Sequence, residues 1–360
     1  MRKIKVALGS SNYEICVGPG LLGRTGRLLL ENGFAGKLVV ITHPGLQRRY
    51  GEALCRTLAG DGFSVSTLLV PEGEAQKTLD TAGRLYQEMS DVFAERTTPV
   101  LALGGGVIGD LAGFVAATYL RGVPFIQMPT TLLAQVDSGI GGKVAVDHGR
   151  IKNRIGVFYQ PSLVIADTDT LKTLPAAELT NGLAEVIKSA AIISREFFSF
   201  LEENLGRIIA GEAAVLEEVV FRTAEIKAGV VMEDEQDSGL RNILNFGHTV
   251  GHAVESVSGF DMPHGQGVAI GMVAAARISR EKGMLDKDGL DRLTGIIEKA
   301  GLPVKIPAIS IEKVMKAMKH DKKVVRGKIR FVLLESIGRA VITDKISPAL
   351  VKQVLENEKT

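Results

Sequence analysis

The stretch VLALGGGVIGDLAGF, residues 100–114, decides the fold of the N-terminal half of the chain. Apolar residues precede three consecutive glycines, and an apolar helical pattern follows them. This order predicts a buried strand, a tight glycine turn and the first turns of a buried helix. Residues 100–120 are nearly uncharged and long enough for a membrane span, but their glycines and the central Asp110 favour the buried α/β unit.

Short apolar runs rich in β-branched residues recur around this stretch and alternate with longer helical patterns. The runs are LVVIT (38–42), FSVSTLLV (63–70), FIQM (125–128) and LVIAD (163–167). Alternation of this kind is typical of parallel strands joined by helices. We therefore expect a Rossmann-like α/β domain with a parallel sheet over residues 1–175.

The pattern changes after Pro175. Amphipathic segments such as AAELTNGLAEVIKSAAI (176–192) and GVAIGMVAAARISREKG (267–283) take over at helical spacing. One exception is KIRFVLLESIGRAVIT (328–343), which predicts a small hairpin around a turn at residues 336–338. A chain of 360 residues is also too long for one ordinary core. We expect a second, mostly α-helical domain over residues 176–360.

Charge and cysteine content exclude several classes of protein. The formal net charge is +2 and basic residues are interleaved with acidic ones, so we expect neither a nucleic-acid nor a membrane partner. Polar residues interrupt the basic N-terminus before an apolar core of signal-peptide length appears. The widely separated Cys16 and Cys55 fit reduced thiols in a cytoplasmic protein.

Three loops follow predicted strands, at the places where open α/β sheets bind ligands. They are PEGEAQKT (71–78), the glycine turn at 104–106 and MPTTLLAQ (128–135). The amides of a glycine turn and the N-terminus of the next helix suit a pyrophosphate. The turn lacks the GxGxxG fingerprint, and close packing alone also explains its glycines. The three loops together favour a dinucleotide site.

Histidines cluster in the second half, where three of the six lie between positions 248 and 264. His248, His252 and Glu255 share one face of the helix predicted for LNFGHTVGHAVES (244–256), and His264 follows in DMPHGQG. Such a set can bind a divalent metal, supply an acid or base, or form a polar helix face. The clustering favours the metal.

Basic residues that stand beside glycines or apolar residues form a further group. They are Arg121, Lys143, Lys152, Lys188, Lys227, Arg241, Lys322 and Lys323. Each alone fits a solvated surface charge, whereas several in one cleft would bind a phosphate and a carboxylate. Spacing along the chain leaves both interpretations open.

Six ordered blocks resemble the 3-dehydroquinate synthase family over nearly the entire chain. The blocks are GGGVIGDLAGFVAATYLRG (104–122), MPTTLLAQVDSGIGGKVAVD (128–147), KNRIGVFYQP (152–161), AEVIK (184–188), GLRNILNFGHTVGHAVE (239–255) and MPHGQGVAIGM (262–272). The resemblance implies an N-terminal NAD-binding domain, a C-terminal helical domain for metal and substrate, an active site between the two domains and a homodimer.

The same matching implies the residues of each site. One zinc or cobalt ion per subunit would be held by Glu185, His248 and His264, which leaves His252 near the substrate phosphate for proton transfer. Residues expected to contact NAD are Glu72, Gly73, Glu74, Ala75, Gln76, Lys77, Gly106, Val107, Ile108, Gly109, Asp110, Thr130, Thr131, Lys143, Lys152, Thr170, Leu171, Lys172 and Thr173. Residues expected to act on the substrate are Asp137, Lys143, Lys152, Asn153, Lys188, Lys227, Arg241, Asn245 and His252, with Lys322 or Lys323, and with Arg121 lent across the dimer.

The activity implied by the resemblance is a lyase reaction of the shikimate pathway, which leads to chorismate and the aromatic amino acids. NAD would transiently oxidise carbon 5 of 3-deoxy-D-arabino-heptulosonate 7-phosphate, which makes the proton on carbon 6 removable. Phosphate elimination, return of the hydride, ring opening and an internal aldol step would then give 3-dehydroquinate. NAD would be regenerated in every turnover.

Two other classes share parts of these patterns. A related sugar phosphate cyclase, such as 2-epi-5-epi-valiolone or 2-deoxy-scyllo-inosose synthase, would fit, although Lys227 and Arg241 suit an acidic substrate. An NAD- and metal-dependent polyol dehydrogenase of the glycerol dehydrogenase type would share the glycine turn but release NADH. The loop over residues 139–152 departs from the usual family pattern at Gly139, Val144 and Asp147, which leaves its effect on specificity open.

Overall fold

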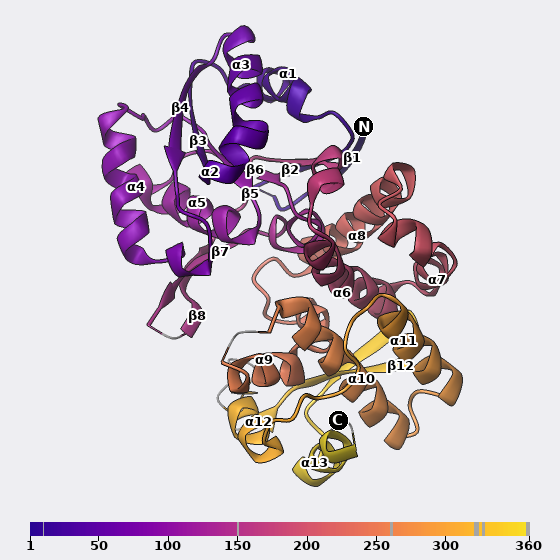
Figure 1. Cartoon of the computed structure of the whole chain (residues 1–360). Coiled ribbons are helices and arrows are strands. Elements are labelled where there is room, and N and C mark those ends of the chain that lie inside the picture. The colour runs from indigo at the N-terminus through magenta and orange to yellow at the C-terminus, as the bar shows by residue number, and fades with distance from the viewer. Residues whose placement is uncertain (10, 150, 260–261, 320–323, 326–327, 358–360) are drawn as a thin grey trace. The chain divides into compact units, whose positions relative to one another are not determined.

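The computed structural model describes residues 1–9, 11–149, 151–259, 262–319, 324–325 and 328–357 (Figure 1). Backbone contacts divide the chain into two compact units. The first unit comprises Met1–Leu174 and Leu216–Gln236, and the second comprises Pro175–Val215 and the residues from Asp237 onward. Each unit is compact and is described separately below.

The first unit is built around a seven-stranded sheet with strand order β1-β2-β9-β6-β5-β3-β4. Its strands are β1 (Arg2–Val6), β2 (Tyr13–Gly18), β3 (Lys37–Thr42), β4 (Ser64–Leu69), β5 (Val100–Gly104), β6 (Phe125–Pro129) and β9 (Leu163–Asp167). Neighbouring strands run parallel from β2 to β4, and only the edge strand β1 pairs antiparallel. The predicted Rossmann-like parallel sheet is present, and residues 100–120 form β5 and the helix after it.

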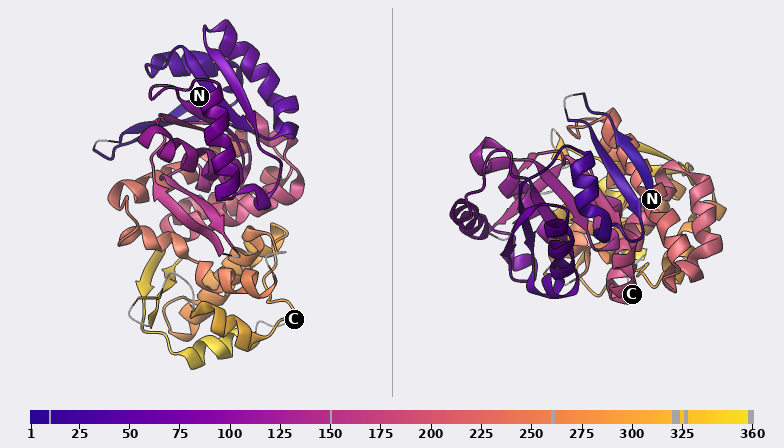
Figure 2. Two further views of the ribbon diagram at one scale, coloured as in Figure 1. Left: turned by 90° about the vertical axis from the view of Figure 1, so that its left-hand side faces the viewer. Right: turned by 90° about the horizontal axis from the view of Figure 1, so that it is seen from above.

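Helices cover both faces of this sheet, which explains why its central strands are apolar on both sides (Figures 1 and 2). On one face, Val39 and Ile41 pack with α4 (Leu79–Asp91) and α5 (Gly106–Thr118). On the other face, Leu38 and Val40 pack with α1 (Thr25–Glu31) and α3 (Glu52–Gly60). Alternate residues of one strand therefore serve two separate cores.

Two further elements complete the first unit. The antiparallel pair β7 (Lys143–His148) and β8 (Ile151–Phe158) packs through Val144 and Val146 against the α4 and α5 side. A short helix α2 (Pro44–Leu46) follows β3, and most of α8 (Ala213–Glu233) belongs to this unit.

Residues 216–236 depart from the predicted assignment of everything after residue 175 to the second domain. Within the first unit, Glu218 of α8 pairs with Arg2, and Lys227 of α8 pairs with Asp137. A helical pattern in the sequence carries no information about such partners.

The second unit is mostly helical. Its helices are α6 (Ala176–Ile193), α7 (Arg195–Ile209), α9 (His248–Val257), α10 (His264–Glu281), α11 (Lys287–Lys299), α12 (Ile311–Met318) and α13 (Pro348–Asn357). The predicted hairpin forms from β12 (Phe331–Ser336) and β13 (Arg339–Thr343), and a two-residue pair links β10 (Val324–Val325) and β11 (Lys328–Ile329). Among the described residues no helix is both long and apolar enough to cross a bilayer.

Glycines allow α9 and α10 to approach closely. A Cβ atom added to Gly251 would lie 2.6 Å from the backbone oxygen of Gly267, and one added to Gly271 would lie 1.8 Å from that of Gly247. Any side chain at these positions would push the helices apart. This contact brings the histidines of α9 next to the first residue of α10.

Candidate functional site

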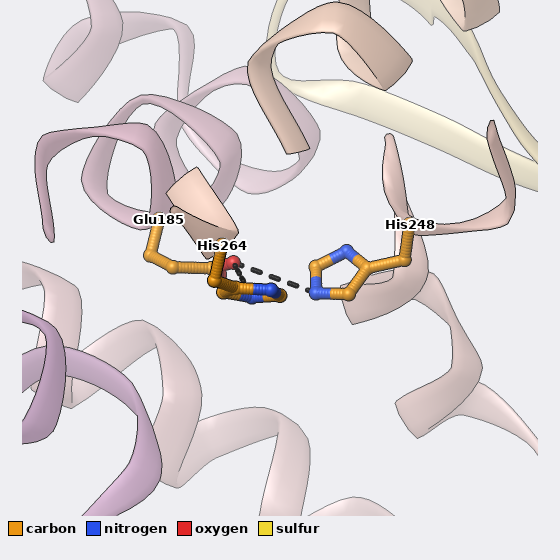
Figure 3. Close-up of side chains that lie close together, drawn as sticks. All are labelled: Glu185, His248 and His264. Carbon is orange, nitrogen blue, oxygen red and sulfur yellow. Dashed lines mark ion pairs between the residues drawn. The ribbon is translucent and has the colours of Figure 1, made fainter. Parts of the chain in front are cut away.

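The side chains of Glu185, His248 and His264 meet in the second unit (Figure 3). They come from α6, from the first residue of α9 and from the first residue of α10. Oε1 of Glu185 lies 3.4 Å from Nε2 of His248 and 3.3 Å from Nε2 of His264. One potential ligand atom from each residue lies within 4.8 Å of the others.

Local structure places both histidines at helix starts. Gly247 precedes α9 with a φ of 80°, a left-handed conformation that glycine adopts without strain. At the start of α10, the backbone amide of Gly265 donates to Oδ1 of Asn181 at 2.6 Å. Asn181 lies on α6, one turn before Glu185, so this bond ties the helix of His264 to the helix of the carboxylate.

The surroundings of Glu185 fit a bound divalent cation. The residue is 1% exposed, and no described residue donates a well-oriented hydrogen bond to either carboxylate oxygen. Burial of a carboxylate is costly unless positive charge or hydrogen bonds compensate it. One carboxylate and two imidazoles are the donor set typical of catalytic zinc, with further positions open for a water or substrate. The predicted triad is therefore brought together with suitable chemistry.

Neighbouring charges shift the pKa values of two members of the triad, Glu185 and His264. Burial raises the pKa of Glu185, but the positive charge of Lys188 and the His264 side chain outweigh burial and hold it below its usual range. Burial lowers the pKa of His264, but Glu185 and Glu255 outweigh that effect and raise it to about 10. A proton on His264 thus balances the carboxylates, and a metal ion would have to displace it, since a ligating imidazole is neutral.

His252 lies beside the triad. Its ring centroid is 5.1 Å from that of His248 and 5.9 Å from that of His264. A second possible ligand group consists of His252, Glu255 and His264, so geometry alone also allows His252 a place in a metal site. Glu255, on the helical face predicted from the sequence, lies near His252 in this second group and also contacts Nδ1 of His264 on the next helix at 3.2 Å.

In the first unit, the expected NAD residues follow the carboxyl ends of parallel strands. Residues 72–77 follow β4, residues 106–110 begin α5 after β5, residues 130 and 131 follow β6, and residues 170–173 follow β9. These strand ends lie on one edge of the sheet, where doubly wound folds bind dinucleotides. The N-terminus of α5, with Gly105 as its N-cap, supplies free backbone amides there.

Lys77 connects two of these segments with strand β8. It is 4% exposed, its Nζ lies 2.6 Å from Oδ2 of Asp110, and it also donates to Oδ1 of Asn153. Burial lowers the pKa of Lys77, but the charge and hydrogen bond of Asp110 outweigh it and raise the pKa above its ordinary value. The loop after β4, the start of α5 and strand β8 are thereby held together through one ammonium group.

The remaining expected residues of the first unit fall into buried and exposed sets. Nζ of Lys227 lies 2.5 Å from Oδ1 of Asp137 and donates to its backbone oxygen at 2.7 Å. Lys152 is exposed and lies 3.9 Å from Glu74, while Lys143 is exposed near the ring of Phe158. Arg121 is exposed after α5, in a left-handed backbone conformation with a φ of 68°.

The remaining expected residues of the second unit are mostly buried. Lys188 and Arg241 are each 2% exposed, and Nζ of Lys188 lies 2.5 Å from Oε2 of Glu185. Asn245 is half-buried in the 3-10 turn before α9. Lys322 and Lys323 lie outside the described residues. Lys188 and Arg241 are therefore not the solvated surface charges that spacing left possible, and Lys188 also contacts a carboxylate.

Two family models match the chain. The model described as 3-dehydroquinate synthase N-terminal matches residues 67–181, and the one described as 3-dehydroquinate synthase C-terminal matches residues 182–324. The chain belongs to the 3-dehydroquinate synthase family. The predicted family is confirmed over both units.

Full-length relatives agree with this assignment. A 3-dehydroquinate synthase from Dehalococcoides mccartyi is 51% identical over 359 residues, which cover 100% of both chains. One from Pelotomaculum thermopropionicum is 48% identical and covers 99% of this chain and 96% of its own. Among solved structures, 2-epi-5-epi-valiolone synthase from Streptomyces hygroscopicus, with NAD⁺ and Zn²⁺ bound, is 28% identical with a TM-score of 0.89 and 98% coverage of both chains. The predicted fold class is confirmed.

Three residues with clear contacts at these sites received no role from the sequence. Glu255 was recognised only as part of a helix face, Asn181 was not singled out, and Asp147 was noted only as a departure from the 3-dehydroquinate synthase pattern. Oδ1 of Asp147 accepts the backbone amide of Asn153 at 2.7 Å, which holds Asn153 at a φ of 52°. An acidic residue before a loop with an Asn was the available signal.

Proposed function

We propose that this chain is a 3-dehydroquinate synthase that converts 3-deoxy-D-arabino-heptulosonate 7-phosphate to 3-dehydroquinate and phosphate, with NAD and one zinc or cobalt ion. The observation that carries the proposal is the buried Glu185, whose Oε1 faces two imidazoles, in a chain 51% identical to a 3-dehydroquinate synthase over its full length. The relatives and both family models favour this reaction over that of a polyol dehydrogenase.

In this proposal, Glu185, His248 and His264 hold the metal. A bound zinc or cobalt ion supplies Lewis acidity that polarises a substrate oxygen. Lys188 lies 2.5 Å from the other carboxylate oxygen of Glu185 and limits the negative charge of the site. His252 is not assigned to the metal; it binds near the substrate phosphate and moves a proton.

The first unit binds NAD at the carboxyl edge of its sheet. When bound there, NAD would supply hydride-transfer chemistry at carbon 5 of the substrate. The chain would orient the cofactor: the N-terminus of α5 would hold the pyrophosphate, and Lys77 contacts Asp110 and Asn153 beside it. Residues 130–131 and 170–173 complete the same edge.

The substrate carries a carboxylate and a phosphate, and the chain offers cations for both. We assign Lys227 and Arg241 to the carboxylate, because a buried guanidinium fits it as a fork. The phosphate is assigned mainly to the other residues: Lys143, Lys152, Asn153, Lys188, Asn245 and His252, with Lys322 or Lys323. Asp137 accepts hydrogen bonds from the Lys227 ammonium group and thereby positions it for the substrate.

The assembly and cellular setting are further parts of the proposal. A homodimer would let the exposed Arg121 of one subunit serve the partner's site, and its left-handed backbone keeps it at the end of a tight turn. A place in the shikimate pathway and a cytoplasmic location follow from the proposed reaction, and two free thiols are compatible with that location.

The decisive experiment measures phosphate and NADH together. Purified protein with NAD, Zn²⁺ or Co²⁺ and the heptulosonate phosphate should release one phosphate per substrate consumed, with no accumulation of NADH. Stoichiometric NADH would contradict the proposal and indicate a dehydrogenase. Omission of NAD and treatment with a chelator should each stop phosphate release.

A further inference from the structure

The two histidines of the triad differ in what lies behind them. Both turn Nε2 toward Oε1 of Glu185, at 3.4 Å for His248 and 3.3 Å for His264. Behind His248, Nδ1 faces the backbone oxygen of Phe246 at 3.1 Å. Behind His264, Nδ1 faces Oε1 of Glu255 at 3.2 Å. One imidazole is therefore backed by a neutral carbonyl and the other by a carboxylate.

The position of Glu255 is built into the packing of α9 on α10. The residue is 6% exposed, in the last turn of α9. A Cβ atom added to Gly267 would lie 2.6 Å from its Oε1, so the missing side chain on α10 makes room for the carboxylate. A buried carboxylate needs a donor, and the Nδ1–H group of His264 supplies one.

We propose that Glu255 is a positioning residue for the metal site, acting through His264. Its carboxylate accepts a hydrogen bond from the Nδ1–H group of His264, fixes the ring orientation and leaves the Nε2 lone pair directed toward the position between Glu185 and His248. A carboxylate behind a ligating imidazole also makes that imidazole a stronger donor. The inference rests on the metal site of the proposed function and adds a residue that does not touch the metal.

A second metal on His252, Glu255 and His264 is the competing explanation, since these residues also form a possible ligand group. A neutral imidazole has one lone pair and one N–H group. His264 could ligate one ion through Nε2 and another through Nδ1 only after losing its ring proton. The hydrogen bond to Glu255 requires no such loss, so the positioning role is the simpler use of the same contacts.

The test compares Glu255→Ala and Glu255→Gln with Ser256→Ala, a control at an exposed position on the same helix. Each full-length protein is loaded with Co²⁺, and its affinity is measured by competition with a chelator, together with its visible spectrum. We expect Glu255→Ala to bind Co²⁺ about 10- to 100-fold more weakly, with altered cobalt absorption bands. Glu255→Gln keeps a neutral acceptor and should fall between Glu255→Ala and the wild type, and Ser256→Ala should match the wild type.

The outcomes separate this inference from the proposed function. If the wild type binds no cobalt, the metal site and the inference both fail. If the wild type binds one equivalent and Glu255→Ala keeps its affinity and spectrum, only the inference fails. Two equivalents in the wild type, with one lost in Glu255→Ala, would make Glu255 a ligand and would also overturn it.

A measurement on the wild type covers the case in which the variants do not fold. With Co²⁺ at the triad, the proton NMR spectrum should contain hyperfine-shifted, solvent-exchangeable signals from the Nδ1–H groups of both His248 and His264. The His264 signal should exchange slowly, because its proton is held by a buried carboxylate. Absence of that second exchangeable signal would show that Nδ1 of His264 carries no proton and would refute the inference.

Discussion

Each unit buries a lysine against a carboxylate, but the two pairs have different surroundings. In the first unit, Nζ of Lys77 lies 2.6 Å from Asp110 and also donates to Asn153. In the second unit, Nζ of Lys188 lies 2.5 Å from Glu185, whose two oxygens still lack well-oriented hydrogen bonds from the described residues. Two imidazoles face Glu185, whereas Asp110 faces the ammonium group of Lys77.

This difference separates a structural role from a ligand-binding role. Buried ion pairs are poor sources of stability, because desolvation offsets much of the attraction. Lys77 instead holds together the loop after β4, the start of α5 and strand β8, so its role is to position these segments. The Glu185 pair leaves carboxylate lone pairs available next to two histidines, which is the arrangement that a cation can complete.

The largest expected effect comes from removing a ligand. His264→Ala should lose bound metal and reduce turnover by about 10³-fold or more, since metal polarisation is worth several kcal/mol. His252→Ala should keep the metal and reduce turnover by about 10²-fold, as expected for a lost proton-transfer group. Metal content by elemental analysis and phosphate release measure the two effects. Loss of metal in His252→Ala alone would show that the ligand assignment is wrong.

Removal of each lysine tests the comparison itself. Lys188→Met and Lys77→Met each leave a buried carboxylate without its cation, which should cost about 3–5 kcal/mol of stability. Zn²⁺ should restore much of the loss in Lys188→Met, because the ion replaces the missing positive charge next to Glu185. Zn²⁺ should stabilise Lys77→Met only as much as it stabilises the wild type, because both proteins keep the same triad. Melting temperatures with and without Zn²⁺ provide the measurement, and equal rescue of both variants would remove the distinction drawn here.

The sequence predicted those parts that depend on local patterns. The apolar runs became strands of a parallel sheet, the stretch after Pro175 became helical, and the hairpin around residues 336–338 formed as expected. Helical spacing alone placed His248 and His252 on one face of a helix. It left open whether that face binds a metal, supplies an acid or base, or is simply polar. The set Glu185, His248 and His264 came from the family resemblance, because its members lie on three helices that no single periodicity connects.

Tertiary contacts account for what the sequence did not predict. Residues 216–236 return to the first unit, where they contact residues far away in the chain, as Glu218 does Arg2. The contact of Glu255 with His264 depends on the glycines that let α9 and α10 approach. No periodic pattern in the sequence predicts either contact.

The smallest expected effect concerns the loop in which this chain departs from the family pattern. Oδ1 of Asp147 accepts a hydrogen bond from the backbone amide of Asn153. The side-chain oxygen of Asn153 in turn accepts a hydrogen bond from Lys77. Asp147→Ala removes one hydrogen bond worth about 1 kcal/mol, which should weaken NAD binding about 5-fold if Asn153 must be held in place. Asp147→Asn keeps an acceptor and should bind NAD as the wild type does. Isothermal titration with NAD decides the matter: equal weakening in both variants would mean that the charge of Asp147, and not its hydrogen bond, supports Lys77.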